Sequence, residues 1–427
     1  MLKELITSLA QRLDAGTASR QRYDKYYASQ QPLTFLAPEV RTALNGRLSR
    51  VSVGIPKLLV DSIAERLRLT GLANAAAWAA MLDNDIDQLA PLVHREALTL
   101  GNAYATVWAK ADGSPLISIE SAHQMTTLED PGTHETLAAF KRWETDRTTE
   151  AVLYQPDRIV RLRANATGAT TQGFDVVEEL DNPLGEVPVV RFKHSDRILS
   201  DGTSAMEPVL SLTDALVKLV TDLLTASEYS ARPRRFATGV ELAEDKDGNA
   251  VNPFPETDRM MISEDPAAKF GQLPGSDLGG YESAIGVVMR QISAVSGLPE
   301  HALGIGGDNP TSADSIRASE AALTSKAESA NQTFGRAWEQ VGRLAVAVKT
   351  GVAPNSVATQ AQWADPSTRS LAQEADSVTK LFASGLLPAS YALSRLGYDA
   401  TEIEKIRVAR RTEALDAAGT DLAALLP

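Results

Sequence analysis

The glycine loop at residues 304–309 (Gly-Ile-Gly-Gly-Asp-Asn) is the stretch of the chain most similar to a phosphate-binding motif. A P-loop needs a Lys-Ser/Thr pair that contacts the phosphates and the metal ion, and it follows a β-strand. This loop has no such pair, and the residues before it have a helical pattern. We therefore do not expect nucleotide binding. The glycines instead predict a loop whose backbone torsions can change widely.

Fragments of a serine hydrolase signature are present, but in the wrong order. Ser377-Val-Thr-Lys380 matches the Ser-x-x-Lys motif of β-lactamases, and Lys349-Thr-Gly351 matches their Lys-Thr-Gly motif. Here the second motif precedes the first, and Lys349-Thr-Gly351 has the pattern of a helix C-terminus. The chain also has no Gly-x-Ser-x-Gly elbow. The sequence therefore predicts that the protein is not an enzyme.

The acidic and histidine residues do not form a metal-binding pattern. Asp83, Asp85 and Asp87 match the start of a calcium loop, but Gln88 and His94 stand where Gly and Glu are needed. The chain has no cysteine, which excludes disulfides and cysteine-ligated zinc. The histidines are scattered without i, i+4 pairing: His94, His123, His134, His194 and His301. We expect no metal site and no cofactor.

The charge of the chain bears on nucleic-acid binding. The 427 residues include 55 acidic and 42 basic side chains, giving a formal net charge of −13. A protein that grips DNA tightly carries a basic surface, so a tight clamp is disfavoured. An acidic wall would still let a duplex slide, because it does not hold phosphates by counterion release. Acidity alone is equally typical of a protein that is simply soluble.

The sequence predicts neither export nor membrane insertion. No apolar run approaches the roughly 20 residues that a membrane-spanning helix needs. The N-terminal stretch carries Arg12 and Asp14 where a signal peptide would continue apolar.

Residues 1–203 predict a mixed unit of helices and strands, and hence an α+β fold class. Apolar residues have helical spacing at Leu5, Leu9 and Leu13, again after Pro56, and from about residue 84 to Gly101. Alternating, strand-like segments follow at residues 103–108, 116–120, 149–154, 158–163, 174–180 and 187–192.

After Gly202 the pattern changes to a helical period. Residues 204–231 predict a helix with one apolar stripe and an opposite polar face formed by Ser211, Asp214, Lys218, Asp222 and Thr225. Lys218 lies four residues from both Asp214 and Asp222, so weak ion pairs are expected. The pattern also fits an ordinary amphipathic core helix.

Three further segments complete the chain. A proline-containing insert at residues 232–277 follows Arg232-Pro-Arg-Arg235, and a second helix is expected to reach Val295. Ser312 is a good N-cap for a helix that continues unbroken to Lys349. Such a length is typical of an elongated scaffold. The tail from residue 373 to 417 is expected to be helical.

Several strings, read in order, carry a resemblance to a known family. They are Arg22-Tyr-Asp-Lys-Tyr-Tyr27 with Gln31-Pro32-Leu33, Pro56-Lys-Leu-Leu-Val-Asp61 with Glu65-Arg66-Leu67, Glu96-Ala-Leu-Thr-Leu-Gly-Asn-Ala-Tyr104, and Asn309-Pro-Thr-Ser-Ala-Asp-Ser-Ile-Arg317. Together with the two helices around the insert, they resemble the portal proteins (head-tail connectors) of long-tailed double-stranded DNA bacteriophages. The resemblance covers most of the chain and weakens after about residue 350.

The resemblance implies a portal fold with parts called wing, stem, clip and crown, assembled as a ring with a central channel. The wing would be residues 1–203, and the stem helices would be 204–231 and 278–298. The clip would be 232–277, the tunnel loop 299–311, the long wing helix 312–350 and the helical crown 351–427.

The resemblance also implies a function and a set of partners. Twelve copies would form a DNA channel at one capsid vertex, for genome packaging, retention and ejection. The expected partners are double-stranded DNA bound without sequence specificity, the terminase large subunit, a head-tail adaptor, and the major capsid and scaffolding proteins. The expected location is the head-tail vertex of the virion, and the host cytoplasm during assembly.

Specific residues follow as candidates for these roles. The tunnel loop would be formed by Gly304, Ile305, Gly306, Gly307, Asp308 and Asn309. The channel-facing stem residues would be Ser211, Asp214, Lys218, Asp222 and Arg290, and the partner-facing clip residues Arg232, Arg234 and Arg235. The charged residues of the stem and clip have an alternative role as intersubunit or surface residues.

Two other classes of function remain open from the sequence. Residues 387–407, with a turn near Gly397 and the basic residues Arg407, Arg410 and Arg411, also match a helix-turn-helix pattern. The chain could then be a DNA-binding regulator that uses its C-terminal helices. Turnover of an ester or a nucleotide would favour a hydrolase.

Overall fold

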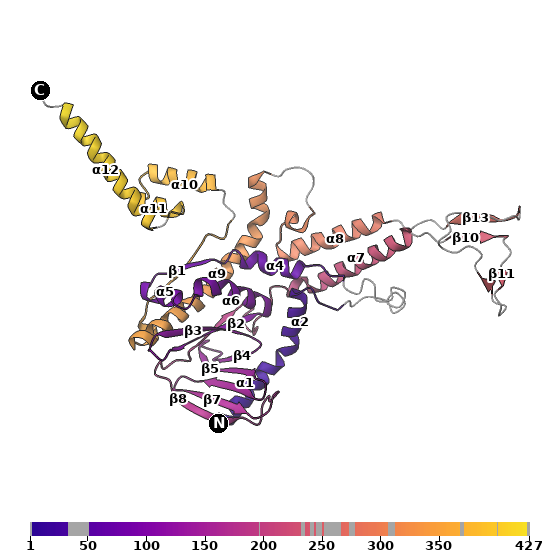
Figure 1. Ribbon diagram of the computed structural model, residues 1–427, viewed down its shortest axis with the longest axis horizontal. Helices are drawn as coiled ribbons and strands as arrows, with labels where there is room; N and C mark the ends of the chain where they lie inside the picture. Colours follow the sequence, from indigo (N-terminus) through magenta and orange to yellow (C-terminus); the bar gives the residue numbers. More distant parts are fainter. Residues whose placement is uncertain are drawn as a thin grey trace. The chain divides into compact units, whose positions relative to one another are not determined.

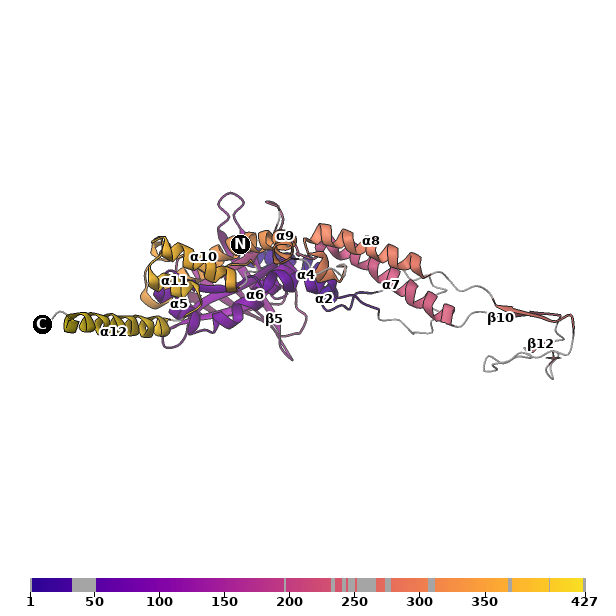
Figure 2. The same cartoon turned by 90° about the horizontal axis from the view of Figure 1, so that it is seen from above.

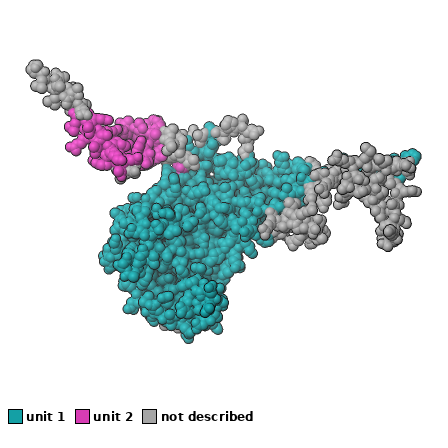
Figure 3. Space-filling view, viewed as in Figure 1, with its two compact units in different colours: residues 1–366 teal, residues 367–427 magenta. Residues whose placement is uncertain are grey.

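A computed structural model describes most of the chain, namely residues 2–32, 51–195, 197–231, 235–239, 243–244, 250–251, 266–272, 278–305, 312–367, 371–398 and 400–424. The residues form two compact units, 1–366 and 367–427 (Figure 3). Helices and strands are both abundant in the first unit, which confirms the α+β prediction.

Among the described residues, five helices come before strand β2. They are α1 (Leu2–Ala15), α2 (Thr17–Tyr27), α4 (Ile55–Ala64), α5 (Ala75–Leu82) and α6 (Ile86–Leu100). Helix α4 begins beside Pro56, and α6 ends at Gly101, which has a φ of +87°. Proline at a helix start and glycine in the left-handed region after its end are the signals that the sequence displayed. Both predicted helix boundaries are therefore confirmed.

Two antiparallel sheets follow the helices. The order in the larger sheet is β4-β5-β6-β7-β8, and in the smaller sheet β3-β2-β9. The strands are β2 (Asn102–Ala109), β3 (Pro115–Ser121), β4 (Met125–Glu129), β5 (Thr136–Glu144), β6 (Thr149–Tyr154), β7 (Arg158–Ala164), β8 (Asp175–Asp181) and β9 (Val189–Lys193). The six predicted strands are confirmed, whereas β4 and β5 were missed.

Helix α1 covers one face of the larger sheet. Leu9 and Leu13 of α1 pack with Phe140, Leu153 and Val160 in one buried cluster. The i+4 spacing of the leucines therefore marks the face of α1 that lies on the sheet.

The long helix α9 (Ala313–Thr350) contributes to the main core from Leu323 onward (Figure 1). Ser312 caps it, because its hydroxyl accepts a hydrogen bond from the Ser315 amide, as predicted. Phe334 and Trp338 are fully buried against α6, β2 and β9. After η3 (Pro354–Ser356), β14 (Ala361–Trp363) pairs with β1 (Leu69–Leu72) beside α9.

Helices α7 (Leu210–Ala231) and α8 (Gly279–Ser296) lie side by side in Figures 1 and 2, and we call them the two-helix arm. Helix α7 begins at Leu210, so the predicted start at Ser204 is wrong. The short 3₁₀ helix η1 (Glu207–Val209) precedes it. The backbone amide of Ala205 bonds to the carbonyl of Leu98 in α6, 2.8 Å away. The amides of Glu207 and Val209 bond to the carbonyls three residues earlier, those of Ser204 and Met206, so this stretch forms a 3₁₀ turn and not the first turn of an α-helix.

Short strands are described between the arm helices. Strand β10 (Arg235–Thr238) pairs with β13 (Lys269–Gln272), and β11 (Ala243–Glu244) pairs with β12 (Ala250–Val251). The 3₁₀ helix η2 (Glu300–Leu303) follows α8.

The second unit contains α10 (Leu371–Ala383), α11 (Ala389–Arg395) and α12 (Ala400–Ala424). This confirms that the tail is helical. Gly397 lies between α11 and α12 with a φ of +93°, in agreement with the predicted turn.

Candidate functional site

The two-helix arm carries the residues that were predicted to face a channel. Ser211 and Arg290 are exposed, whereas Asp214, Lys218 and Asp222 are half-buried. Val217 and Thr221 lie on the buried side of α7, where the Thr221 hydroxyl donates to the carbonyl of Val217. The predicted polar face is therefore only partly open to solvent in one copy of the chain.

Lys218 pairs with only one of its two candidate partners. Its ammonium group forms an ion pair with Asp222, one helical turn along α7. Asp214 instead accepts a hydrogen bond from the phenol of Tyr26 in α2, at 2.7 Å. Burial and this hydrogen bond raise the pKa of Tyr26 to about 12. One of the predicted channel residues thus ties the arm to an N-terminal helix.

A second contact joins the same two regions. The guanidinium of Arg22 in α2 binds both carboxylate oxygens of Glu207 in η1, at 2.8 and 3.0 Å. Burial and a hydrogen bond to Glu207 raise the pKa of Tyr23 to about 12. We call this set, Arg22, Tyr23, Tyr26, Glu207 and Asp214, the arm-base cluster.

The next tyrosine of α2 extends this network to α4 and α6. Tyr27 donates to Asp61 Oδ1 at 2.9 Å, and Arg95 Nε donates to the same oxygen at 3.0 Å. Lys57 forms an ion pair with Asp61 Oδ2 at 2.5 Å. Burial acts in the opposite direction, but the hydrogen bonds from Lys57 and Tyr27 hold the pKa of Asp61 below its ordinary value.

From the sequence these tyrosines were assigned no role, although their spacing contained a signal. Tyr23, Tyr26 and Tyr27 have i, i+3 and i+4 spacing, so their side chains leave the same side of α2. What could not be read from the spacing was the partner, because Asp214 is 188 positions away in the sequence.

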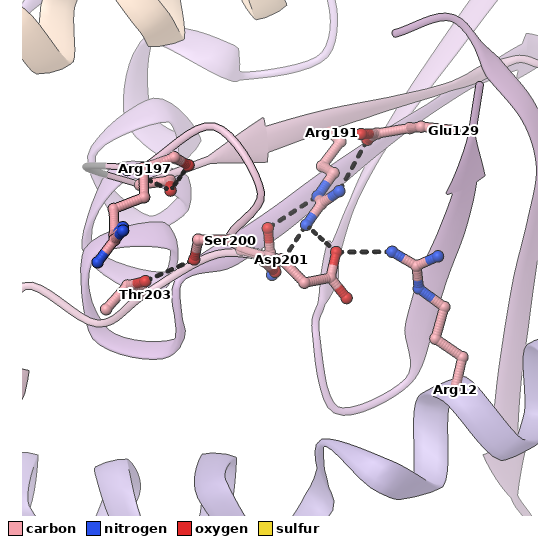
Figure 4. Close-up of polar contacts among 9 residues, drawn as sticks. Arg12, Glu129, Arg191, Arg197, Ser200, Asp201 and Thr203 are labelled. Atoms are coloured by element: carbon pink, nitrogen blue, oxygen red, sulfur yellow. Dashed lines mark hydrogen bonds and ion pairs between the residues drawn. The ribbon is translucent and has the colours of Figure 1, made fainter. Parts of the chain in front are cut away.

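The loop at residues 194–203, which leads into the arm, is held by a buried arginine (Figure 4). Arg191 donates to Asn102 Oδ1, Glu129 Oε1 and the carboxylate of Asp201, at 2.7 to 2.8 Å. Its side chain is 6% exposed. Arg12 from α1 reaches the same Asp201 oxygen at 2.7 Å. The path of the chain before α7 is therefore held at Asp201 by charge pairs from two other elements, β9 and α1.

The predicted tunnel loop is described only at its start. Gly304 has a φ of +72° at the end of η2, a conformation that favours glycine. Ile305 follows with its amide bonded to the carbonyl of Glu300 at 3.1 Å. Gly306, Gly307, Asp308 and Asn309 lie outside the described residues. The same holds for Arg232 and Arg234 and for the side chain of Arg235.

Of the residues in the rejected metal patterns, Asp85 lies at an exposed helix start and His94 lies in the core. Asp85 precedes α6 with a φ of 55°. His94 is fully buried; its Nδ1 bonds to the Leu67 carbonyl at 3.1 Å, and its Nε2 accepts a hydrogen bond from Trp338 at 2.8 Å. Burial lowers the pKa of His94 to about 3. Within the described part of the chain, no three metal-binding side chains form a group.

The described helices also bear on membrane insertion. None of them combines the length and the apolar character that a bilayer-spanning segment requires.

Comparison with known proteins places the chain. The phage portal proteins described as SPP1 Gp6-like match residues 17–414. The portal protein of Mycobacterium phage D29 is 31% identical over 419 residues, covering 90% of this chain and 83% of the relative. That of Mycobacterium phage L5 is 31% identical over 385 residues, covering 83% and 78%.

Solved structures with some similarity come from gene transfer agent particles. A chain from the neck of an empty particle is 14% identical with a TM-score of 0.48, covering 87% of this chain and 96% of that chain. A chain from the virion of the native particle is 16% identical with a TM-score of 0.46, covering 87% and 96%. The family assignment rests on the sequence matches to portal proteins and not on these structures. This chain belongs to the SPP1 Gp6-like family of phage portal proteins, which are structural components of the virion and not enzymes.

Proposed function

We propose that twelve copies of this chain form a ring around a DNA channel at one vertex of the capsid. The two-helix arm would be the stem of the ring, residues 1–203 with the long helix the wing, and residues 351–427 the crown. The ring would guide DNA inward during packaging, retain it, and release it at ejection.

One observation carries the proposal, namely the exposure of apolar side chains along the arm. Leu224 of α7 and Val287 and Val295 of α8 are 39%, 52% and 43% exposed. On the same two helices, Leu210, Leu216 and Ile292 belong instead to the main core. An isolated pair of helices gains little from exposed aliphatic groups, whereas copies packed side by side around an axis would bury them.

The charges support passage of DNA and not a tight grip. Lys218 is already paired with Asp222, which leaves it a weaker partner for phosphates. The net charge of −13 per copy makes the ring strongly acidic. A duplex in such a channel would meet few positively charged side chains that could hold its phosphates, so it would slide. Arg290, exposed on α8, is the candidate for transient phosphate contact.

The remaining parts of the chain are assigned to partners. Residues 232–277, with Arg232, Arg234 and Arg235, would form the clip that docks the terminase large subunit and later the head-tail adaptor. Residues 299–311 would form the tunnel loop that narrows the channel. The major capsid and scaffolding proteins would contact the ring in the host cytoplasm during assembly.

Electron microscopy of the purified, tag-free chain, together with its native mass, tests the ring. Rings with an open centre and a mass of about twelve copies are expected. A chain that remains monomeric at every protein concentration would overturn the ring.

The regulator hypothesis has its own test. The predicted pair of helices around Gly397 is present as α11 and α12. Arg407 of α12, however, forms an ion pair with Glu404 at 2.9 Å, which makes it a weaker partner for DNA phosphates. A portal should bind DNA weakly, without sequence preference, and lose binding steeply with added salt. Tight binding to one DNA sequence would favour the regulator and contradict the portal role.

A further inference from the structure

A pocket of about 300 Å³ lies next to the residues that lead into α7. Its lining comes from α4, α6, the end of β9, the loop at residues 194–203 and the middle of α9. Two lysines line it, Lys193 at the end of β9 and Lys326 in α9. We call it the lysine pocket.

The lysine pocket carries positive charge that no described residue neutralises. Neither Lys193 nor Lys326 forms an ion pair with any residue that the structure describes, and none of the described lining residues is acidic. The chain has 55 acidic and 42 basic side chains, so a shortage of carboxylates does not explain this. Elsewhere in the same unit a partly buried lysine does have a partner, since Lys141 forms an ion pair with Glu120 at 2.6 Å. The two lysines of the pocket are therefore left for a group from outside the described chain.

Lys326 is held in position by the end of α8. Its ammonium group donates a hydrogen bond to the carbonyl of Ser296, the last residue of α8, at 2.5 Å. This bond uses one of the three N–H donors of an ammonium group, and the others remain available. Partial burial lowers the pKa of Lys326, and no carboxylate opposes that shift. The pocket thus presents a positioned cation whose loss of water is not compensated by an anion.

The apolar side of the pocket determines which kind of anion fits. Ile63, Leu98 and Phe334 line it together with the lysines, and all three are buried. A phosphate group has no apolar atoms to place against such a wall and would only lose water there. The side chain of Glu or Asp instead places its CH₂ groups against the wall and its oxygens at the ammonium groups. The pocket therefore fits an acidic side chain.

The net charge of the chain favours a second copy as the source of that side chain. Copies that each carry a net charge of −13 repel one another, so their contacts need places where a carboxylate meets an unpaired cation. In the proposed ring a neighbour is held alongside, which raises the effective concentration of its acidic side chains at the pocket.

We propose that the lysine pocket of one copy binds the carboxylate of an acidic side chain from the neighbouring copy, with Lys193 and Lys326 as its ammonium partners. This contact rests on the proposed ring. It joins two different surfaces, a pocket on one copy and an acidic side chain on the next, as a head-to-tail interface requires.

Carbodiimide coupling of the assembled ring tests the contact, because this reagent joins a lysine amine to a carboxylate where the two are in direct contact. Rings are assembled from an equal mixture of isotopically light and heavy copies. Mass spectrometry of the digested rings should find Lys193 or Lys326 joined to an Asp or Glu in peptide pairs that combine a light and a heavy copy. Rings in which both lysines stay uncoupled, or couple only within one copy, would overturn the contact and leave the ring intact.

Charge variants measure how much the contact contributes. Lys193→Ala with Lys326→Ala should weaken association between copies by about tenfold per contact, because the incoming carboxylate loses both partners. Lys193→Arg with Lys326→Arg keeps the charge and should assemble like the natural chain. Lys110→Ala, at an exposed lysine just after β2, is the matched control and should not change association. Lys193→Ala alone leaves the Lys326–Ser296 bond in place, so it should weaken association even if loss of that bond loosens α8.

Two results would contradict the proposal in different ways. Alanine variants that associate normally but bind a short DNA duplex more weakly would show that the lysines contact phosphates and not a neighbouring copy. Absence of rings from the natural chain would refute the ring itself, and this contact with it.

Discussion

The phenol of Tyr26 donates a hydrogen bond to the carboxylate of Asp214, 2.7 Å away, and so joins α2 to the first helix of the arm. Arg22, one helical turn before Tyr26 in α2, makes a second connection to Glu207. The orientation of the arm is therefore set by side chains from an N-terminal helix as well as by apolar packing at its base. Movement of the arm relative to residues 1–203 would require these bonds to break.

Tyr26→Phe should destabilise the protein modestly. Removing the hydroxyl leaves Asp214 half-buried without its donor, and the free energy of unfolding should fall by about 1 to 2 kcal/mol. Urea unfolding monitored by fluorescence measures this. Tyr391→Phe, at an exposed tyrosine, is the matched control and should change nothing. An unchanged Tyr26→Phe variant would mean that the bond does not hold the arm.

The same tyrosine predicts a response to alkali. The pKa of Tyr26 is raised to about 12 in the folded protein, against an ordinary value of 10.0. The native state therefore keeps a proton that the unfolded state loses, so this contribution is complete below pH 10 and is lost as pH rises toward 12. Urea midpoints between pH 9 and 11 should fall less steeply in Tyr26→Phe than in the natural chain.

His94 predicts a loss of stability in acid. Its pKa is lowered from 6.5 to about 3 by burial, so the unfolded chain takes up a proton there that the native state refuses. Its contribution is complete above pH 6.5 and falls as pH drops toward 3, by roughly 4 to 5 kcal/mol in total. Urea midpoints measured from pH 7 to 4 should show this slope. Substitution of the exposed His134 by Gln should leave the slope intact; a flat profile would contradict the prediction.

Gly101→Ala should destabilise the chain more than Gly113→Ala. Both glycines have positive φ, at 87° and 78°, so alanine is strained at either position. At Gly101 a Cβ would also lie 2.7 Å from the backbone of Gly202 and Thr203, whereas at Gly113 it would meet nothing within 4 Å. We expect a cost of about 1 kcal/mol at Gly113 and at least about twice that at Gly101. If urea unfolding gave the same loss of free energy for both variants, the backbone at residues 202–203 would be able to move away from the added Cβ without a penalty.

Shortening the loop Gly304–Asn309 should impair packaging while rings still assemble. The proposed tunnel loop follows the moving duplex because glycine allows large backbone changes. Particles assembled with the shortened chain should contain less DNA than natural ones, measured by the length of encapsidated DNA. Normal rings in the micrographs would serve as the control for assembly. A shortened variant that packages full-length DNA would contradict the proposed role of this loop in packaging.

The sequence by itself determined the elements whose signals are local. The start of α9 at Ser312, the end of α6 at Gly101 and six of the strands follow from capping chemistry and from apolar spacing within a few residues. It also determined the family, because several short strings occur in the order typical of portal proteins, although each string alone is a weak signal. The start of α7 was misjudged, because residues 207–209 form a 3₁₀ turn with bonds between residues three apart, such as the Val209 amide to the Met206 carbonyl.

Only the tertiary structure decided which side chains meet. Tyr26 and Asp214 are 188 positions apart, and His94 and Trp338 are 244 apart. No periodicity within one element indicates a partner on another, because such pairs depend on how the elements pack.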